Sequence, residues 1–201
     1  MVAKSTTPAR TGKPGHSEAE PTMATFTIDP AHTDVLFSAK HMMVTTVRGK
    51  FTDVSGTIDV NEADPTASKA EITVQAGSVD TGFGARDTHL RSNDFFGVET
   101  FPEIRVVSTA IRPKGGKEYV VTADVTIRDI TKSVDFDVEF LGFFPGMDGA
   151  RHAGFTATAK VNRKEWNLNW NVALETGGWL VGDNIKLEVE VAIIESVAVA
   201  A

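Results

Sequence analysis

The sequence predicts an all-β protein of about eight antiparallel strands, with one short helix in a long connection. Most segments after residue 24 alternate apolar and polar side chains, which is the period of a strand with one dry and one wet face. Their connections are short, which favours antiparallel neighbours over parallel strands joined by crossovers. Only residues 77–102 interrupt the alternation at length. The pattern alone leaves a barrel and a sandwich open.

Composition narrows the function. A chain of 201 residues that is 41% hydrophobic has enough apolar side chains for one complete core, and we expect a single domain. Lys and Arg number 20 against 27 Asp and Glu, with a net charge of -7 and no basic stripe, so we expect no nucleic-acid partner. Cysteine is absent, which excludes disulfides and thiolate metal sites. No apolar run approaches the roughly 20 residues of a membrane span, so we expect no integral membrane segment.

The two ends of the chain are predicted to lie outside the folded domain. Residues 1–24 are rich in Pro, Ser, Thr, Gly and Lys, and we expect a disordered N-terminal tail. The tail lacks the apolar h-region of a secretory signal, which predicts a cytoplasmic location. Met23 is a candidate alternative start, which would make residues 1–22 dispensable. The domain is predicted to span residues 25–196, followed by a short tail at 197–201.

The first half of the domain contains four strand-like segments. Pro30 separates the first from the second, while Gly49 and Gly56 mark places where a long strand is expected to bend. A loop around Pro65 precedes the fourth. The segments are residues 25–28, 35–39, 47–60 and 72–76.

The second half is more regular. Residues 132–140 alternate without exception, with Val134, Phe136 and Val138 on one face and acidic or polar residues on the other. A Lys-Gly-Gly-Lys sequence at 114–117 predicts a tight turn between the first two strands of this half. The predicted strands are residues 104–108, 119–127, 132–140, 155–161 and 185–193.

The interruption at residues 77–102 predicts a helix over 85–96. Leu90, Phe95 and Phe96 would share its apolar face, and the four-residue spacing of Asp87 and Arg91 predicts an ion pair on the opposite face.

Two roles are open for this helix. It is either an aromatic plug that completes the core, or a lid over a cavity with Arg86, His89 and Arg91 facing the ligand. The lid requires a cavity. The many alanines on the predicted dry faces weakly favour a cavity, because small inward residues leave room for a ligand in an eight-stranded barrel.

All three tryptophans, Trp166, Trp170 and Trp179, fall in the irregular stretch 162–184. Such a group either lines a mouth or caps a core.

The sequence contains no motif that predicts catalysis. Its five histidines lack metal-ligand spacing, and we expect neither a metal nor a cofactor. GxSxG and P-loop motifs are also absent, so we expect no catalytic residues. The alternative is an enzyme in which His89 acts as acid or base and Arg86 and Arg91 hold an anionic head group. A third possibility is an interaction module that uses the exposed sheet face.

Several motifs together carry a family resemblance. RDTHLRSNDFF at 86–96, TIRDIT at 126–131 and ETGGWLVGD at 175–183 follow one another as they do in the YceI-like family of bacterial polyisoprenoid-binding, lipocalin-like proteins. The segments 32–51 and 153–183 also resemble this family.

The resemblance implies an extended eight-stranded antiparallel lipocalin-like barrel, with a short helix in the crossover after the fourth strand. Its apolar tunnel would hold a polyisoprenoid or related amphiphile for carriage, storage or sequestration, and a homodimer is possible. Arg86, His89 and Arg91 would meet the polar head group. The residues expected to line the lumen and mouth are Phe37, Met42, Phe51, Leu90, Phe95, Phe96, Ile127, Phe136, Phe155, Trp166, Trp170 and Leu174.

Overall fold

The computed structural model describes residues 23–147, 149–175 and 177–196. The strands in this part of the chain are β1 (Met23–Ile28), β2 (Asp34–His41), β3 (Thr45–Phe51), β4 (Val54–Asn61), β5 (Lys69–Gln75), β6 (Val79–Asp80), β7 (Glu103–Gly115), β8 (Glu118–Ile127), β9 (Ile130–Pro145), β10 (Arg151–Asn162) and β11 (Val181–Glu195). The helices are α1 (Gly84–Arg91) and the 3-10 helices η1 (Pro30–His32), η2 (Pro65–Ala67), η3 (Ala76–Ser78) and η4 (Arg163–Trp166).

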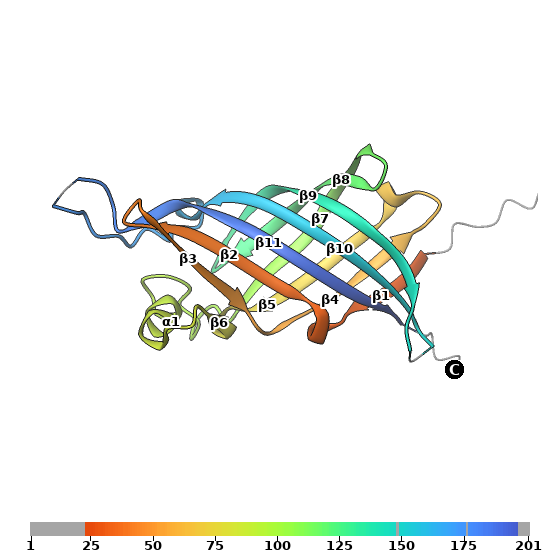
Figure 1. The fold of residues 1–201 in the computed structure, drawn as a ribbon, viewed down its shortest axis with the longest axis horizontal. Helices are drawn as coiled ribbons and strands as arrows, with labels where there is room; N and C mark the ends of the chain where they lie inside the picture. Colours follow the sequence, from red (N-terminus) through yellow and green to blue (C-terminus); the bar gives the residue numbers. More distant parts are fainter. Residues whose placement is uncertain (1–22, 148, 176, 197–201) are drawn as a thin grey trace, which may run out of the picture.

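The strands form a closed antiparallel barrel (Figure 1). Neighbours run in the order β1, β4, β5, β7, β8, β9, β10 and β11, and β11 then pairs with β1 to complete a ring of eight. This confirms the predicted eight-stranded barrel and excludes the sandwich. Met23 and Ala24, which we expected in the tail, belong to β1. The predicted tails at 1–22 and 197–201 lie outside the described residues.

One end of the barrel is extended by β2, β3 and β6. The long strand β11 pairs with β1 near its C-terminus, where Ile193 faces Ile28, and with β2 nearer its N-terminus, where Val189 faces Val35. Between β1 and β2 the chain turns through η1, and the Asp29 carboxylate caps this turn by accepting the N–H of Ala31 at 3.0 Å. β2, β3 and β6 therefore lengthen the barrel wall only on the side next to β11.

The opposite end of the barrel is filled by aromatic rings. Phe26 is fully buried and stacks on Phe143 with ring centroids 6.0 Å apart. Phe140 contacts both Phe143 and Phe155, at centroid distances of 5.0 and 5.2 Å. The guanidinium of Arg151 lies over Phe143 at 4.6 Å. These rings leave this end of the barrel as packed core.

The crossover helix α1 lies beside β6, at the extended end of the barrel (Figure 1). The predicted helix over 85–96 was too long, because α1 ends at Arg91. Ser92 follows with an extended backbone, and its hydroxyl donates to the carbonyl of His89 at 2.8 Å. A serine side chain that bonds to the backbone in this way competes with the helix. Residues 92–97 therefore form turns rather than a further helical turn.

A candidate ligand-binding cavity

The extended end of the barrel contains a cavity of about 520 Å³. Strands of the barrel wall supply most of its lining, and the crossover, η4 and the segment that follows η4 supply the rest. The apolar lining residues are Val35, Phe37, Ala39, Val47, Phe51, Val74, Phe83, Ala85, Leu90, Phe95, Phe96, Ile104, Val125, Ile127, Val161, Trp166, Leu168, Trp170, Leu180, Val181, Ile185 and Leu187. A volume of this size falls within the range of small-molecule sites.

The buried carboxylate of Asp87 holds α1 against the residue that directly follows β6. Asp87 accepts the backbone N–H of Thr81 at 3.0 Å and also accepts the Thr81 hydroxyl. The same hydroxyl accepts the Nε of Arg86 at 2.7 Å, and Arg86 Nη2 donates to the Thr81 carbonyl at 2.9 Å. Arg86 lines the cavity with its orientation fixed by these bonds.

Arg91 has a different role from the one we expected. Its Nε donates to the carbonyl of Gly77 and its Nη2 to the carbonyl of Val79, both at 2.7 Å. The predicted ion pair with Asp87 is wrong, because Asp87 binds Thr81 instead. Arg91 does not contribute to the cavity lining; its bonds hold the crossover against the chain that precedes α1.

An aromatic cluster closes one side of the cavity. The ring of His89 meets Phe95 and Trp170 edge-on, with centroid distances of 5.1 and 4.5 Å. Phe95 and Trp170 also contact each other at 5.5 Å. His89 Nε2 lies 2.9 Å from a carboxylate oxygen of Asp94, which fixes the plane of the imidazole. The cluster joins the crossover to the segment after η4, although the two are far apart in the sequence.

A buried arginine lies next to this cluster in the cavity wall. Arg163 is 4% exposed, and its guanidinium donates to the carbonyls of Leu168, Trp170 and Gly182. Burial lowers the pKa of Arg163 from its ordinary value, while the nearby Asp183 carboxylate acts in the opposite direction. Arginine remains protonated in proteins, so this site holds a fixed cation. Sequence reasoning missed Arg163, because nothing in the local sequence distinguishes it from a surface arginine.

The three tryptophans do not form one cluster. Trp166 is buried at the cavity wall, and its Nε1 donates to the carbonyl of Val125 at 3.0 Å. Trp170 belongs to the aromatic cluster with His89, while Trp179 is 52% exposed. Each ring therefore has its own role, and only Trp166 and Trp170 line the cavity.

The structure brings most of the sequence-predicted site residues together. Those that line the cavity are Phe37, Phe51, Arg86, His89, Leu90, Phe95, Phe96, Ile127, Trp166 and Trp170.

Four predicted lumen residues, and Arg91, lie outside this lining. Phe155 packs among the aromatics at the filled end, and Phe136 packs against the core without reaching the cavity. Met42 is exposed in the turn between β2 and β3, and Leu174 lies in the loop before β11. Alternation gives the face of a strand but not the depth along the barrel, so it could not show that the two phenylalanines lie outside this lining.

The cavity combines an apolar interior with a polar mouth. The polar lining is limited to Lys40, His41, Thr81, Arg86, His89 and Arg163. Within the part of the chain that the structure describes, no three His, Asp or Glu side chains gather as a metal ion would require. None of the described helices is long and apolar enough to cross a bilayer. The arrangement suits an apolar chain with a polar or anionic end at the mouth.

A closed antiparallel barrel with an apolar cavity at one end places this protein among the ligand-binding β-barrels. A family model described as the YceI-like domain matches residues 26–193. A UPF0312 protein of Staphylococcus aureus (strain USA300) is 38% identical over 167 residues, covering 83% of this chain and 95% of that protein. One from Staphylococcus epidermidis is 40% identical over the same length and coverage. The chain therefore belongs to the YceI-like family.

Solved structures show the same fold. The Campylobacter jejuni YCEI protein matches with a TM-score of 0.67 at 28% identity, covering 78% of this chain and 90% of that one. Burkholderia cenocepacia BcnA matches with a TM-score of 0.70 at 23% identity, covering 82% and 98%. A polyisoprenoid binding domain from Saccharophagus degradans, implicated in plant cell wall breakdown, matches with a TM-score of 0.64 at 12% identity, covering 87% and 100%. The last two likenesses concern the fold alone.

Proposed function

We propose that this protein binds a polyisoprenoid or a related long-chain amphiphile in its cavity, and that it carries, stores or sequesters this molecule without chemical change. The observation that carries the proposal is the lining of the cavity, which is apolar except at its mouth. Burial of an apolar chain contributes about 0.8 kcal/mol per CH₂, so the interior alone provides a strong driving force. Membership of the YceI-like family and the name of the Saccharophagus degradans neighbour support this class of ligand.

The cations at the mouth suit a polar or anionic end group. Arg86 and Arg163 both line the cavity with guanidinium groups held by hydrogen bonds to the protein. A head group there would gain charge-assisted hydrogen bonds from Arg86 without much further ordering of this side chain, while the donors of Arg163 bind carbonyls and Asp183. Arg91 is not part of this proposal, because it does not line the cavity.

The test is native mass spectrometry of protein purified from cells, followed by titration with isoprenoid alcohols. We expect a co-purified lipid, or saturable binding of the added alcohol. Ala39→Trp should fill the cavity and abolish binding, since Ala39 lines it. Ser38→Trp is the matched control, because the neighbouring residue of β2 points to the opposite face. Absence of lipid and of binding in the folded wild type would refute the proposal.

The enzyme alternative has one structural observation in its favour, which is the contact between His89 Nε2 and Asp94. An imidazole held by a carboxylate is the arrangement of a general base. We expect His89→Gln to bind isoprenoids as the wild type does. We also expect that neither protein turns over an isoprenoid diphosphate. Turnover of an isoprenoid diphosphate that disappears in this variant, at an unchanged melting temperature, would favour the enzyme hypothesis over the carrier hypothesis.

A cytoplasmic location remains a prediction, which cell fractionation would test.

A further inference from the structure

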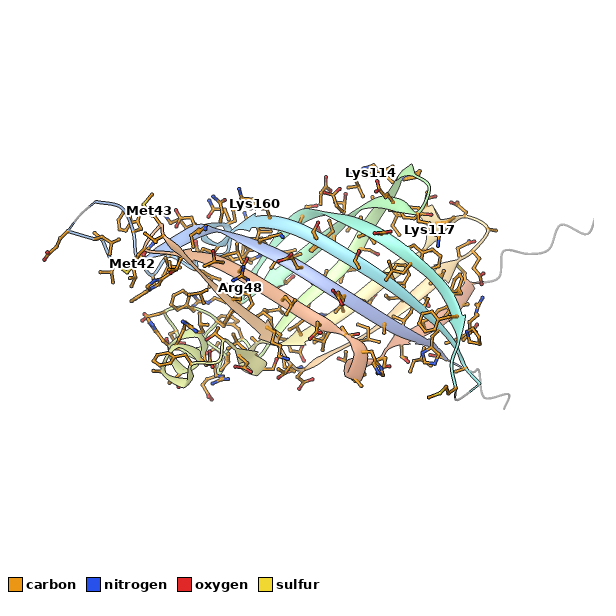
Figure 2. All side chains as sticks on the ribbon, in the orientation of Figure 1. Met42, Met43, Arg48, Lys114, Lys117 and Lys160 are labelled. Atoms are coloured by element: carbon orange, nitrogen blue, oxygen red, sulfur yellow. The ribbon has the colours of Figure 1, made fainter. Side chains whose placement is uncertain are left out.

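Large apolar side chains are exposed beside the mouth of the cavity. Met42, Met43 and Val44 form the turn between β2 and β3, and Met43 and Val44 are 71% and 79% exposed. Val172 and Trp179, in the loop before β11, are also exposed. We call these five residues the apolar rim. Figure 2 shows Met42 and Met43 at the tip of the β2–β3 hairpin, at the end of the barrel far from the C-terminus.

The two parts of the apolar rim are in contact. The N–H of Met42 donates to the carbonyl of Leu180 at 2.8 Å, which joins the hairpin to the loop before β11. A Cβ added to Gly178 would lie 2.6 Å from the Met43 sulfur, so this side chain packs directly on the loop backbone. Leu180 also lines the cavity. The rim is therefore continuous with the apolar interior.

The backbone conformation of the turn does not favour methionine at either position. Met42 has a φ of 50° and Met43 a φ of 59°, both in the left-handed region. Asn and Gly adopt this region with less strain and are the preferred residues of such turns. Two methionines here weaken the turn and expose apolar surface to water. Strained residues of this kind are found at functional sites.

Basic side chains lie on the outer face of the barrel wall behind the hairpin. The strand register places Arg48 opposite Ser38, Ser38 opposite Lys186, and Lys186 opposite Lys160. Three cations therefore cross four neighbouring strands in one row, and the middle one, Lys186, forms an ion pair with Glu188 at 2.6 Å. Figure 2 shows Arg48 and Lys160 between the hairpin tip and the middle of the barrel.

The charge on this face changes sign with distance from the mouth. Four residues further along β2 from Ser38, another row places Asp34 opposite Glu190, and Thr156 faces both Glu190 and Glu139. Glu139 pairs in turn with Glu118. Although the whole chain carries a net charge of -7, Arg48 and Lys160 lie nearer the mouth than this acidic row. The row between them is mixed, with Lys50 and Glu188 on either side of Leu36. Over a screening length of about 8 Å, the local charges determine what this end attracts.

We propose that the mouth of the barrel docks on a lipid bilayer that carries anionic head groups. The apolar rim enters the interface, Arg48 and Lys160 meet the head groups, and the acidic row lies farther from the bilayer. The cavity then opens at the bilayer, so that an apolar chain transfers without crossing water. A second copy of this chain is a poorer occupant, because contact through the same face would bring the cations together.

The test is co-sedimentation with vesicles of phosphatidylcholine, with and without phosphatidylglycerol. We expect binding that requires phosphatidylglycerol and weakens as salt is added. Met42→Asn/Met43→Gly removes rim side chains and introduces residues suited to the turn, so the fold should persist while binding falls about tenfold or more. Arg48→Ser/Lys160→Ser should weaken binding similarly.

Two controls change residues of the same kinds far from the mouth. Lys114→Ser/Lys117→Ser removes two positive charges, and Figure 2 shows both lysines far from Met42 and Met43. Met147→Ser removes an exposed methionine from the loop between β9 and β10. Both controls should bind vesicles as the wild type does.

Three results would overturn the proposal. The first is wild-type protein that binds neither kind of vesicle. The second is control variants that lose as much vesicle binding as the rim variant. The third is a dimer that depends on the rim residues in sedimentation, without vesicle binding. The proposal builds on the proposed lipid-binding function, but the two fail separately. Vesicles here contain ordinary phospholipids alone, whereas cavity binding is measured with farnesol in solution.

Discussion

Phe95 and Phe96 are adjacent in the chain but contact different partners. Phe95 packs with His89 and Trp170, while the ring of Phe96 meets Phe51 at a centroid distance of 5.6 Å. Both also line the cavity, so part of each ring faces space rather than protein. This placement fits a lid, in which the aromatics serve the ligand as well as the fold.

Truncation of either ring to alanine should therefore affect binding more than stability. A fully packed phenylalanine costs about 3 to 5 kcal/mol when truncated, and we expect a smaller loss in Phe95→Ala and Phe96→Ala. Isoprenoid affinity should fall about tenfold or more, each decade being 1.4 kcal/mol. Phe26→Ala, at the filled end, is the control that should show the full stability loss. Urea unfolding with and without ligand measures both; a core-sized loss at unchanged affinity would identify a plug.

The contribution of Arg163 to the stability of the protein depends on its burial. Its guanidinium donates to the carbonyls of Leu168 and Trp170, and the residue itself is only 4% exposed. We expect Arg163→Met, which has a similar length but no donors, to lower the free energy of unfolding by about 2 to 5 kcal/mol. Arg163→Lys should retain part of this, since an ammonium cannot match the planar fork. An unchanged urea midpoint in Arg163→Met would contradict this role.

At the scale of elements, the pairing of β2 with β3 sets the width of the cavity. Phe37 lies opposite Gly49, and a Cβ on Gly49 would be 2.5 Å from the Phe37 ring. The absence of a side chain at Gly49 thus allows the Phe37 ring to lie across β3. Because Phe37 also contacts Phe51, at 5.5 Å between centroids, any shift of its ring changes the cavity wall.

Gly49→Ala should displace the Phe37 ring and weaken isoprenoid binding, with the larger effect on longer or bulkier chains. Its melting temperature should also fall, because the added methyl would lie 2.7 Å from the Cγ2 of Thr81, which hydrogen bonds to Asp87 and Arg86 hold in place. Ligand titration with a series of chain lengths is the measurement. The double variant Gly49→Ala/Phe37→Leu should recover binding, and an undiminished affinity in Gly49→Ala would show that Phe37 does not define the wall.

At the scale of the whole molecule, the barrel has two unlike ends. The end near β1 is packed with phenylalanines, and the end near α1 contains the cavity. If the proposed function is correct, the ligand enters and leaves by one mouth. The proposed docking of the β2–β3 hairpin would place this mouth at the bilayer.

The tail prediction belongs to this scale. Residues 1–22 contain no aromatic side chain and few large apolar ones that could join a core. We expect their deletion to leave the melting temperature and isoprenoid affinity unchanged. Calorimetry of both forms tests this, and a drop of several degrees would show that this segment stabilises the barrel.

The sequence by itself determined the strands and their faces. Alternation at residues 132–140 and 185–193 is local information, because the period of a strand follows from its own backbone. The motif at 86–96 also located the crossover, and eight of the twelve predicted lumen residues line the cavity.

Only the tertiary structure decided the depth of each side chain and the partner of each polar group. Phe136 and Phe155 alternate correctly, yet the register of their strands carries them away from the cavity. Arg91 and Arg163 bind carbonyls that other segments bring to them, so neither role is encoded in neighbouring residues. The depth of a side chain in the barrel and the partner of a polar group depend on pairing between distant strands and loops. The pattern within one segment does not specify that pairing.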